Sequence, residues 1–218
     1  MKSTSSLIAS LVVNVKPVRR LRSPAVRTLC WLLFAALMLA LVAVGHGVRP
    51  DLMQKLHQPV YAIGVAAALM TSVLATTAVF IGSIPGRSKR WLLLPMPAFA
   101  IWISTIGYGC LTAWVSFGPD GMSPGETARC FATLAITSIP LSLSLLIMLR
   151  YVARLYPVPI AMTASLAVAA TTAVALSLFH QIDATLMILM LNFGVAALFL
   201  GLSRLYGQRL FEWVTPME

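Results

Sequence analysis

The chain has 218 residues, of which 59% are hydrophobic and only 10% are charged, and its formal net charge is +10. Its mean hydropathy of +0.89 is far above that of a soluble domain of this size, which excludes a soluble enzyme. A basic soluble protein would suggest nucleic acid, but here the Lys and Arg residues flank long apolar runs. There they orient helices and contact anionic lipid headgroups, so we expect membrane lipids and no direct nucleic-acid partner.

The first element, residues 7-15, is a short apolar stretch at helical spacing that ends before Pro17. We expect it to be retained, because Ser10 and Asn14 interrupt it and no small-residue cleavage site of a signal peptide follows. Its apolar face could rest on the membrane surface or dock a cytoplasmic partner. The candidate partner-binding residues are Leu11, Val12, Val15, Arg19, Arg20 and Arg22.

Six further apolar runs are long enough to cross about 30 Å of hydrocarbon, which takes roughly 20 residues of helix. The predicted fold class is therefore all-α, a polytopic membrane protein with a bundle of six transmembrane helices. The fifth run is rich in Ala, Ser and Thr, which allow close helix packing, so we expect it at the centre of the bundle. The six runs are residues 28-46, 60-84, 91-115, 130-149, 158-178 and 184-203.

An even number of spans places both termini on one side, and the basic residues indicate which side. Thirteen Lys and Arg residues lie on the side of the termini, against three on the other, Arg49, Lys55 and Arg129. By the positive-inside rule, both termini are cytoplasmic. The predicted domains are a cytoplasmic N-terminal segment (1-27), a six-helix transmembrane domain (28-203) and a cytoplasmic C-terminal tail (204-218).

Sequence motifs for catalysis are absent. The chain has no Walker loop, nucleotide fingerprint, HExxH or nucleophile elbow, and its spans hold no carboxylate pair of the sort that serves proton relays. We therefore expect neither an enzyme nor a bound cofactor, and the pattern argues against a pump or ion-coupled transporter.

The groups able to do chemistry gather on the predicted outer side. Cys110 ends the third run, Cys130 begins the fourth, and His180 lies between the fifth and sixth. Two thiols and an imidazole suit a soft or borderline cation, and the two thiols alone could form a disulfide. These three residues are the candidate sensor and metal-ligand residues, whereas Cys30, at the cytoplasmic end of the first run, is assigned to packing.

Several different short motifs follow one another along nearly the whole chain. They are Pro17-Val18-Arg19-Arg20-Leu21, Arg49-Pro50-Asp51-Leu52, Pro85-Gly86-Arg87 through Leu94-Pro95, Gly107-Tyr108-Gly109-Cys110, Trp114, Cys130, Leu149-Arg150 and Phe179-His180 with Asp183. From about residue 7 to 210, the chain resembles the NrsF family of bacterial inner-membrane proteins, which act as anti-sigma factors. It departs from that family at Leu191 and Asn192, where the family often carries an aromatic residue and a histidine.

The resemblance implies a protein that holds an extracytoplasmic-function (ECF) sigma factor at the bacterial inner membrane and releases it on stress, with the outer-side cysteines contributing to the response. Two other classes are a small membrane transporter or channel subunit and a membrane thiol oxidoreductase. The first requires a polar path, for which the spans offer only Ser, Thr and Asn192. The second requires a CxxC pair or a quinone partner, and no specific residue pattern points to either.

Overall fold

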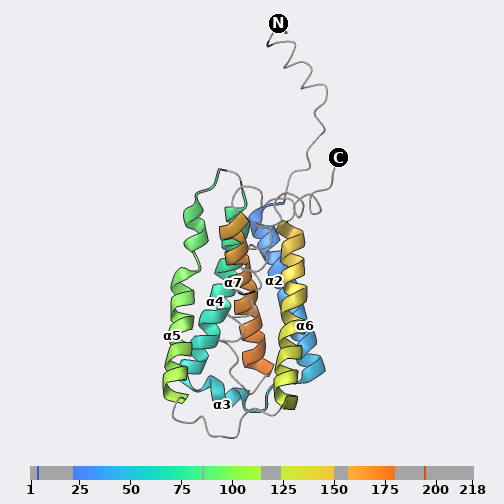
Figure 1. Cartoon of the computed structure of the whole chain (residues 1–218), viewed down its shortest axis with the longest axis vertical. Coiled ribbons are helices and arrows are strands. Elements are labelled where there is room, and N and C mark those ends of the chain that lie inside the picture. Colours follow the sequence, from blue (N-terminus) through green and yellow to red (C-terminus); the bar gives the residue numbers. More distant parts are fainter. Residues whose placement is uncertain are drawn as a thin grey trace.

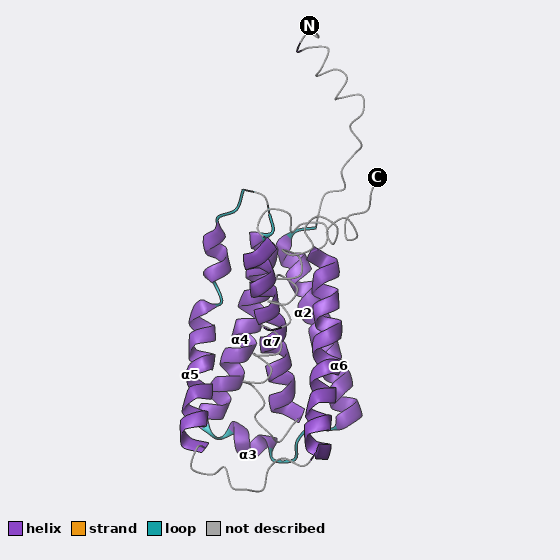
Figure 2. Ribbon diagram, viewed as in Figure 1, coloured by secondary structure: helices purple, strands orange, loops and turns teal. Residues whose placement is uncertain are grey.

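The structure is a computed structural model, and it describes residues 4, 22–84, 86–113, 124–149, 157–179 and 194. Every element in these ranges is a helix (Figure 2). Five segments are long and apolar enough to cross a membrane, whereas the predicted sixth span lies outside the described residues except for residue 194. The elements are α2 (Pro24–His46), α3 (Leu52–Leu56), α4 (Pro59–Gly82), the 3-10 helix η1 (Lys89–Leu93), α5 (Met96–Ala113), α6 (Pro124–Leu149) and α7 (Pro157–Phe179).

The long helices form one bundle in which α4 and α7 pack against each other along the middle (Figure 1). Helix α5 flanks α4 on one side, and α6 packs against α7 and α2 on the other. Contacts between helix ends give the directions, because Arg27 at the start of α2 bonds to Met148 at the end of α6, and Arg49 after α2 bonds to Leu178 at the end of α7. We call these two ends of the bundle the Arg27 end and the Arg49 end.

Helix α7 is the most deeply buried of the long helices. Of the residues in its apolar stretch, 67% are buried, against 50% in α4. Residues 166–176 are buried without interruption, which is three turns and therefore includes every face of the helix. Small side chains make this possible, among them Ala167, Ala169 and Ala170, which have no exposed surface. The predicted central position of this helix is confirmed.

Several hydroxyl groups inside the bundle form hydrogen bonds to other groups of the protein. Ser72 of α4 and Thr171 of α7 share a buried hydrogen bond of 2.6 Å between their hydroxyl oxygens, while the hydroxyl of Thr172 donates to the carbonyl of Val168 one turn earlier. Trp31 of α2 donates its indole N–H to the Ser144 hydroxyl of α6. In an apolar environment an unpaired polar group is costly, so these bonds allow Ser, Thr and Trp to be buried.

Helix boundaries differ from the predicted spans where capping signals intervene. Helix α2 begins four residues earlier than predicted, because Ser23 caps it and Pro24 occupies its first position. Arg27 therefore lies inside the helix and not in the flanking segment. The predicted run 91-115 is divided into η1 and α5 around Pro95, which cannot continue a helix with a full set of hydrogen bonds.

The outward faces of the helices are apolar. On α2 the exposed side chains recur about every four residues and form one stripe, which water would not favour and lipid would. This arrangement is compatible with a multi-pass membrane protein. The stripe consists of Val26, Leu29, Leu33, Leu37, Leu41 and Val44.

The close packing of α7 predicts sensitivity to added volume. Ala170→Leu places three extra carbon atoms in a site with no exposed surface, and overpacking of this kind typically costs about 1–3 kcal/mol. We expect a lower melting temperature in a thermal unfolding experiment in detergent. The matched control is Ala36→Leu, at an exposed position of α2, which should change stability by less than about 0.5 kcal/mol. Equal melting temperatures of the two variants would contradict the central position of α7.

Candidate functional site

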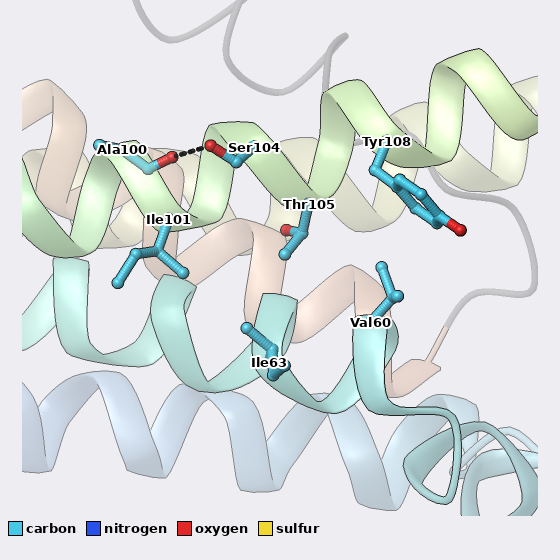
Figure 3. Close-up of a pocket in the computed structure, with 7 residues that line it drawn as sticks. All are labelled: Val60, Ile63, Ala100, Ile101, Ser104, Thr105 and Tyr108. Carbon is cyan, nitrogen blue, oxygen red and sulfur yellow. Dashed lines mark hydrogen bonds between the residues drawn. The ribbon is translucent and has the colours of Figure 1, made fainter.

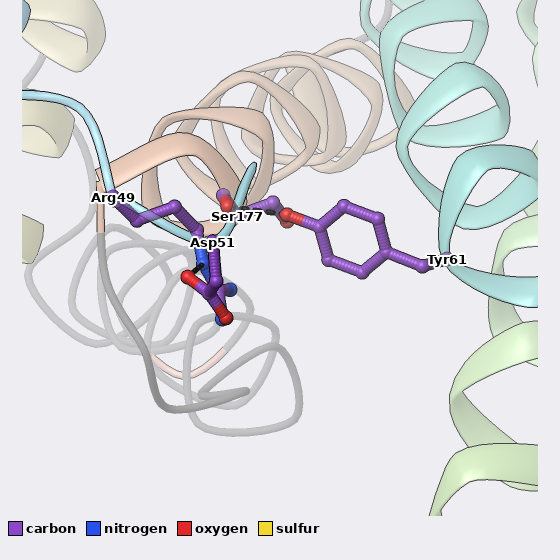
Figure 4. Close-up of polar contacts among 4 residues, drawn as sticks. All are labelled: Arg49, Asp51, Tyr61 and Ser177. Atoms are coloured by element: carbon purple, nitrogen blue, oxygen red, sulfur yellow. Dashed lines mark hydrogen bonds and ion pairs between the residues drawn. The ribbon is translucent and has the colours of Figure 1, made fainter. Parts of the chain in front are cut away.

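A polar cluster at the Arg49 end joins three parts of the chain (Figure 4). Arg49 and Asp51, in the connection between α2 and α3, form a two-pronged ion pair in which Nε donates to Oδ1 and Nη2 donates to Oδ2, each at 2.7 Å. Tyr61, in the first turn of α4, donates its hydroxyl to the carbonyl of Ser177 in α7. We call Arg49, Asp51, Tyr61 and Ser177 the clasp.

The clasp and the backbone of Arg49 provide hydrogen-bond donors for carbonyl groups in the last turn of α7. The final carbonyls of a helix lack donors within the helix, and here the Ser177 carbonyl accepts from Tyr61 while the Leu178 carbonyl accepts from the backbone N–H of Arg49 at 3.2 Å. The Arg49 guanidinium also lies 5.9 Å from the centroid of the Tyr61 ring, within the range of a cation–π contact. Three chain segments are thus held at one point.

The electrostatics of the clasp follow from this geometry. The Arg49 side chain is only 4% exposed, so it needs a counter-ion, and Asp51 supplies one from a more accessible position at 36%. The hydrogen bond from Arg49 lowers the pKa of Asp51 below its usual value, and the hydrogen bond to Asp51 raises the pKa of Arg49. Both groups therefore remain charged throughout the physiological pH range, and the ion pair between Arg49 and Asp51 is intact at neutral pH.

A second buried arginine lies at the Arg27 end. The Arg27 guanidinium donates to the Met148 carbonyl in the last turn of α6 and lies 4.6 Å from the centroid of the Phe80 ring near the end of α4. No carboxylate pairs with Arg27 within the described residues, and the hydroxyl of the neighbouring, buried Thr28 has no partner there. A helix C-terminus carries partial negative charge, so the ends of α6 and α4 provide the compensation for this cation.

Of the six residues that the sequence proposes for partner binding, only Arg22 lies within the described residues. Arg22 is described and exposed, directly before the cap residue Ser23. The other five residues of this set lie outside the described residues, and so does the candidate sensor residue His180, so the roles of all six stay predictions. The five are Leu11, Val12, Val15, Arg19 and Arg20.

The two candidate sensor cysteines belong to helices that are well separated. Cys110 lies in the last turn of α5 and Cys130 in the second turn of α6, and these helices flank the α4–α7 pair on opposite sides (Figure 1). The described residues contain no group of three His, Cys, Asp or Glu side chains that could hold a metal ion. Cys30, which the sequence assigned to packing, is exposed on α2, and that assignment is wrong.

A groove of about 370 Å³ runs along α4 and α5 (Figure 3). Its lining is mainly apolar, and its hydroxyls are already engaged, with Ser104 donating to the carbonyl of Ala100 and Thr105 to that of Trp102. The groove therefore offers no chain of free polar groups for a transported solute. The lining residues are Val60, Ile63, Ala100, Ile101, Ser104, Thr105 and Tyr108.

The two buried arginines, Arg27 and Arg49, were not predicted from the sequence as structural features. For the clasp a signal existed, since Arg49 and Asp51 lie two residues apart at the end of an apolar run and carry opposite charges. For Arg27 the signal was the Ser23-Pro24 pair, which places the start of the helix before it. Its partners Phe80 and Met148 follow only from the packing of α2 against α4 and α6.

Within the described ranges, the architecture is that of an all-helical bundle compatible with a multi-pass membrane protein, whose polar contacts fasten helix ends. The chain belongs to the NrsF family, negative regulators of sigma F, because the model of that family matches residues 11–213. This confirms the resemblance found in the sequence. No curated protein and no solved structure matches the chain.

The clasp predicts a stability that declines in acid. Because the pKa of Asp51 is below 3.8 in the folded chain, the ion pair contributes fully above that ordinary value, and the contribution disappears as the pH falls through the lowered value. We expect Asp51→Asn to lower the melting temperature in detergent at neutral pH, and the difference from wild type to shrink in acid. Gln54→Ala, at an exposed site in α3, is the control. A difference that persists at low pH would contradict the ion-pair explanation.

Proposed function

We propose that the chain is a membrane-bound anti-sigma factor that sequesters an ECF sigma factor through its cytoplasmic N-terminal segment and releases it on stress sensed at the outer face of the bacterial inner membrane. The observation that carries this proposal is the match to the negative regulators of sigma F, which begins at residue 11 and extends through the whole bundle. The mechanism is binding and release, with no catalytic step.

The distribution of charge supports the proposed orientation. Among the described residues, the Arg27 end carries five cations, against Arg49, Lys55 and Arg129 at the other end, and by the positive-inside rule the more basic end is cytoplasmic. A sixth span at residues 184-203 would return the chain to that side, with both termini in the cytoplasm. The five cations are Arg22, Arg27, Arg87, Lys89 and Arg90.

The bundle offers a physical route from its helices to the N-terminal segment. That segment continues directly into α2, whose first turn Arg27 joins to the end of α6 and to Phe80 of α4. A shift of α6 along its axis would therefore change the start of α2. A signal moves a binding equilibrium only by its difference in affinity for the two arrangements, and a hundredfold release corresponds to about 2.7 kcal/mol.

The sensor in this proposal consists of Cys110 and Cys130, with His180 as a third ligand for a soft cation. A disulfide requires the two Cα atoms to lie within about 7 Å of each other. Since α5 and α6 flank opposite sides of the α4–α7 pair (Figure 1), a disulfide or a shared cation would draw the ends of these helices together. Movement of α6 is the link to Arg27.

The proposed partner surface is tested by co-purification from detergent-solubilised membranes. Arg19→Glu/Arg20→Glu should reduce the sigma factor that accompanies the full chain by at least roughly tenfold, because charge-assisted hydrogen bonds are worth about 1.5–3 kcal/mol each. The matched control is Arg204→Glu/Arg209→Glu in the C-terminal tail, which makes the same change in charge and should retain the partner. Normal co-purification with the first variant would place the docking site elsewhere.

The proposed sensor is tested with a reporter gene controlled by the sigma factor. Cys110→Ser/Cys130→Ser should keep the sigma factor sequestered but abolish the response to a thiol-reactive metal or oxidant, because the thiolate is the reacting species. Cys30→Ser, which removes the exposed thiol of α2, should respond as wild type. A double variant that still releases the sigma factor normally would reduce both cysteines to packing residues.

A further inference from the structure

The segment before α5 is fixed firmly to the bundle at the Arg27 end. Leu92 of η1 is buried against Gly82 at the end of α4, so closely that a Cβ added at Gly82 would lie 2.9 Å from a methyl carbon of Leu92. The turn before η1 uses Gly86 at a φ of 84°, where other residues are strained, and the Ser88 hydroxyl caps η1 by accepting from the N–H of Arg90. The side chains of this segment are therefore presented from a rigid base.

Four of these side chains face outward and combine charge with apolar surface. Arg87 and Arg90 are exposed, and beside them Trp91 is 40% and Leu93 61% exposed. We call these four residues the η1 surface. The cations Arg87 and Arg90 come first in the segment, and the large apolar side chains follow directly before α5, so the surface changes from charged to apolar along the chain.

The cations of the η1 surface have no counter-charge in the described part of the chain. The two described acidic positions, Asp51 and Glu126, belong to the Arg49 end, in the clasp and at the start of α6. The remaining described charges at the Arg27 end are basic. An anion that neutralises Arg87 and Arg90 must therefore come from another segment or another molecule.

We propose that the η1 surface binds the phosphate headgroup of an anionic phospholipid in the cytoplasmic leaflet. A guanidinium matches a phosphate with two parallel hydrogen bonds, and indole rings favour the headgroup level of a bilayer. Leu93 lies one turn deeper toward α5 and contacts the first acyl carbons. The proposal rests on the orientation given under the proposed function.

The position of the segment favours a lipid over a protein as the occupant. Trp91 and Leu93 fall within the apolar stretch Lys89–Tyr108, which is one of the candidate spans, so they lie at the border of the hydrocarbon. A soluble protein that covered them would have to displace lipid there, whereas a phospholipid satisfies the cations and the apolar groups at once.

The test measures binding of a fluorescent phosphatidylglycerol to the full chain in detergent, with fluorescent phosphatidylcholine as the reference probe. We expect clear preference for phosphatidylglycerol, reduced at high salt. Arg87→Gln/Arg90→Gln should weaken its binding roughly thirtyfold, which is about 2 kcal/mol at about 1 kcal/mol for each arginine near an anionic surface. Equal binding of the two lipids by the wild-type chain would overturn the proposal.

Further variants separate the site from net charge and from misfolding. Arg204→Gln/Arg209→Gln removes the same charge from the tail and should keep the preference, so an equal loss there would overturn a specific site. Arg87→Lys/Arg90→Lys keeps the charge but loses the paired hydrogen bonds, so it should weaken binding less than Arg87→Gln/Arg90→Gln does. Trp91→Ala, with every arginine in place, should also weaken binding, and unchanged binding in both Trp91→Ala and Arg87→Gln/Arg90→Gln would refute the η1 surface.

Co-purified sigma factor is measured on the same samples. Loss of the sigma factor from Arg87→Gln/Arg90→Gln with unchanged phosphatidylglycerol binding would make this surface a protein contact and overturn the lipid proposal. A wild-type chain that binds phosphatidylglycerol as expected but retains no sigma factor would instead refute the proposed function and leave the lipid site standing.

Discussion

The close contact between α4 and α7 determines where the other helices can lie. Small residues on α7 allow the two backbones to approach, and the hydrogen bond between Ser72 and Thr171 fixes their register inside the bundle. Helix α5 then has only the outer side of α4 to pack against, and α6 occupies the other side with α2. Because residues 166–176 are buried on every face, α7 cannot rotate or slide without disturbing each neighbour at once.

At each end of the bundle, an arginine donates a hydrogen bond to a backbone carbonyl at the end of a helix. Helix ends leave carbonyls without donors, and here Arg27 donates to Met148 while the backbone of Arg49 donates to Leu178. The compensation differs, since Arg49 has Asp51 beside it and Arg27 has an aromatic ring and helix ends. The Arg49 end is thus closed by a complete ion pair, whereas the Arg27 end depends on weaker and more geometry-dependent contacts. Among the described residues, the arginine at the end that leads to the N-terminal segment is therefore the one without an ion pair.

Much of this fold could be predicted from sequence, because lipid-length apolar runs and small-residue content are local properties. The central position of the Ala-rich fifth run and the positions of five helices follow from them. The contacts of the sites could not be predicted in the same way. Arg27 and Met148 are 121 residues apart, and nothing in their spacing indicates that the start of α2 lies beside the end of α6. Likewise the short connection between α5 and α6 suggests adjacent helices, but the α4–α7 pair separates them (Figure 1).

The exposed stripe on α2 also sets a length scale for the surrounding bilayer. From Val26 to Val44 the helix rises about 27 Å, at about 1.5 Å per residue, which is slightly less than the roughly 30 Å of an average hydrocarbon core. Arg27 lies at one border of this band, and Arg49 lies beyond the other border. Moving either border into the hydrocarbon core would bury a charged side chain there, which is costly. The candidate span of α2, Pro24–Gly45, has 22 residues and rises about 33 Å, so the helix as a whole matches the hydrocarbon core of an average bilayer. The two arginines therefore set the depth at which α2 would lie in a bilayer, and with it the level at which the N-terminal segment would begin.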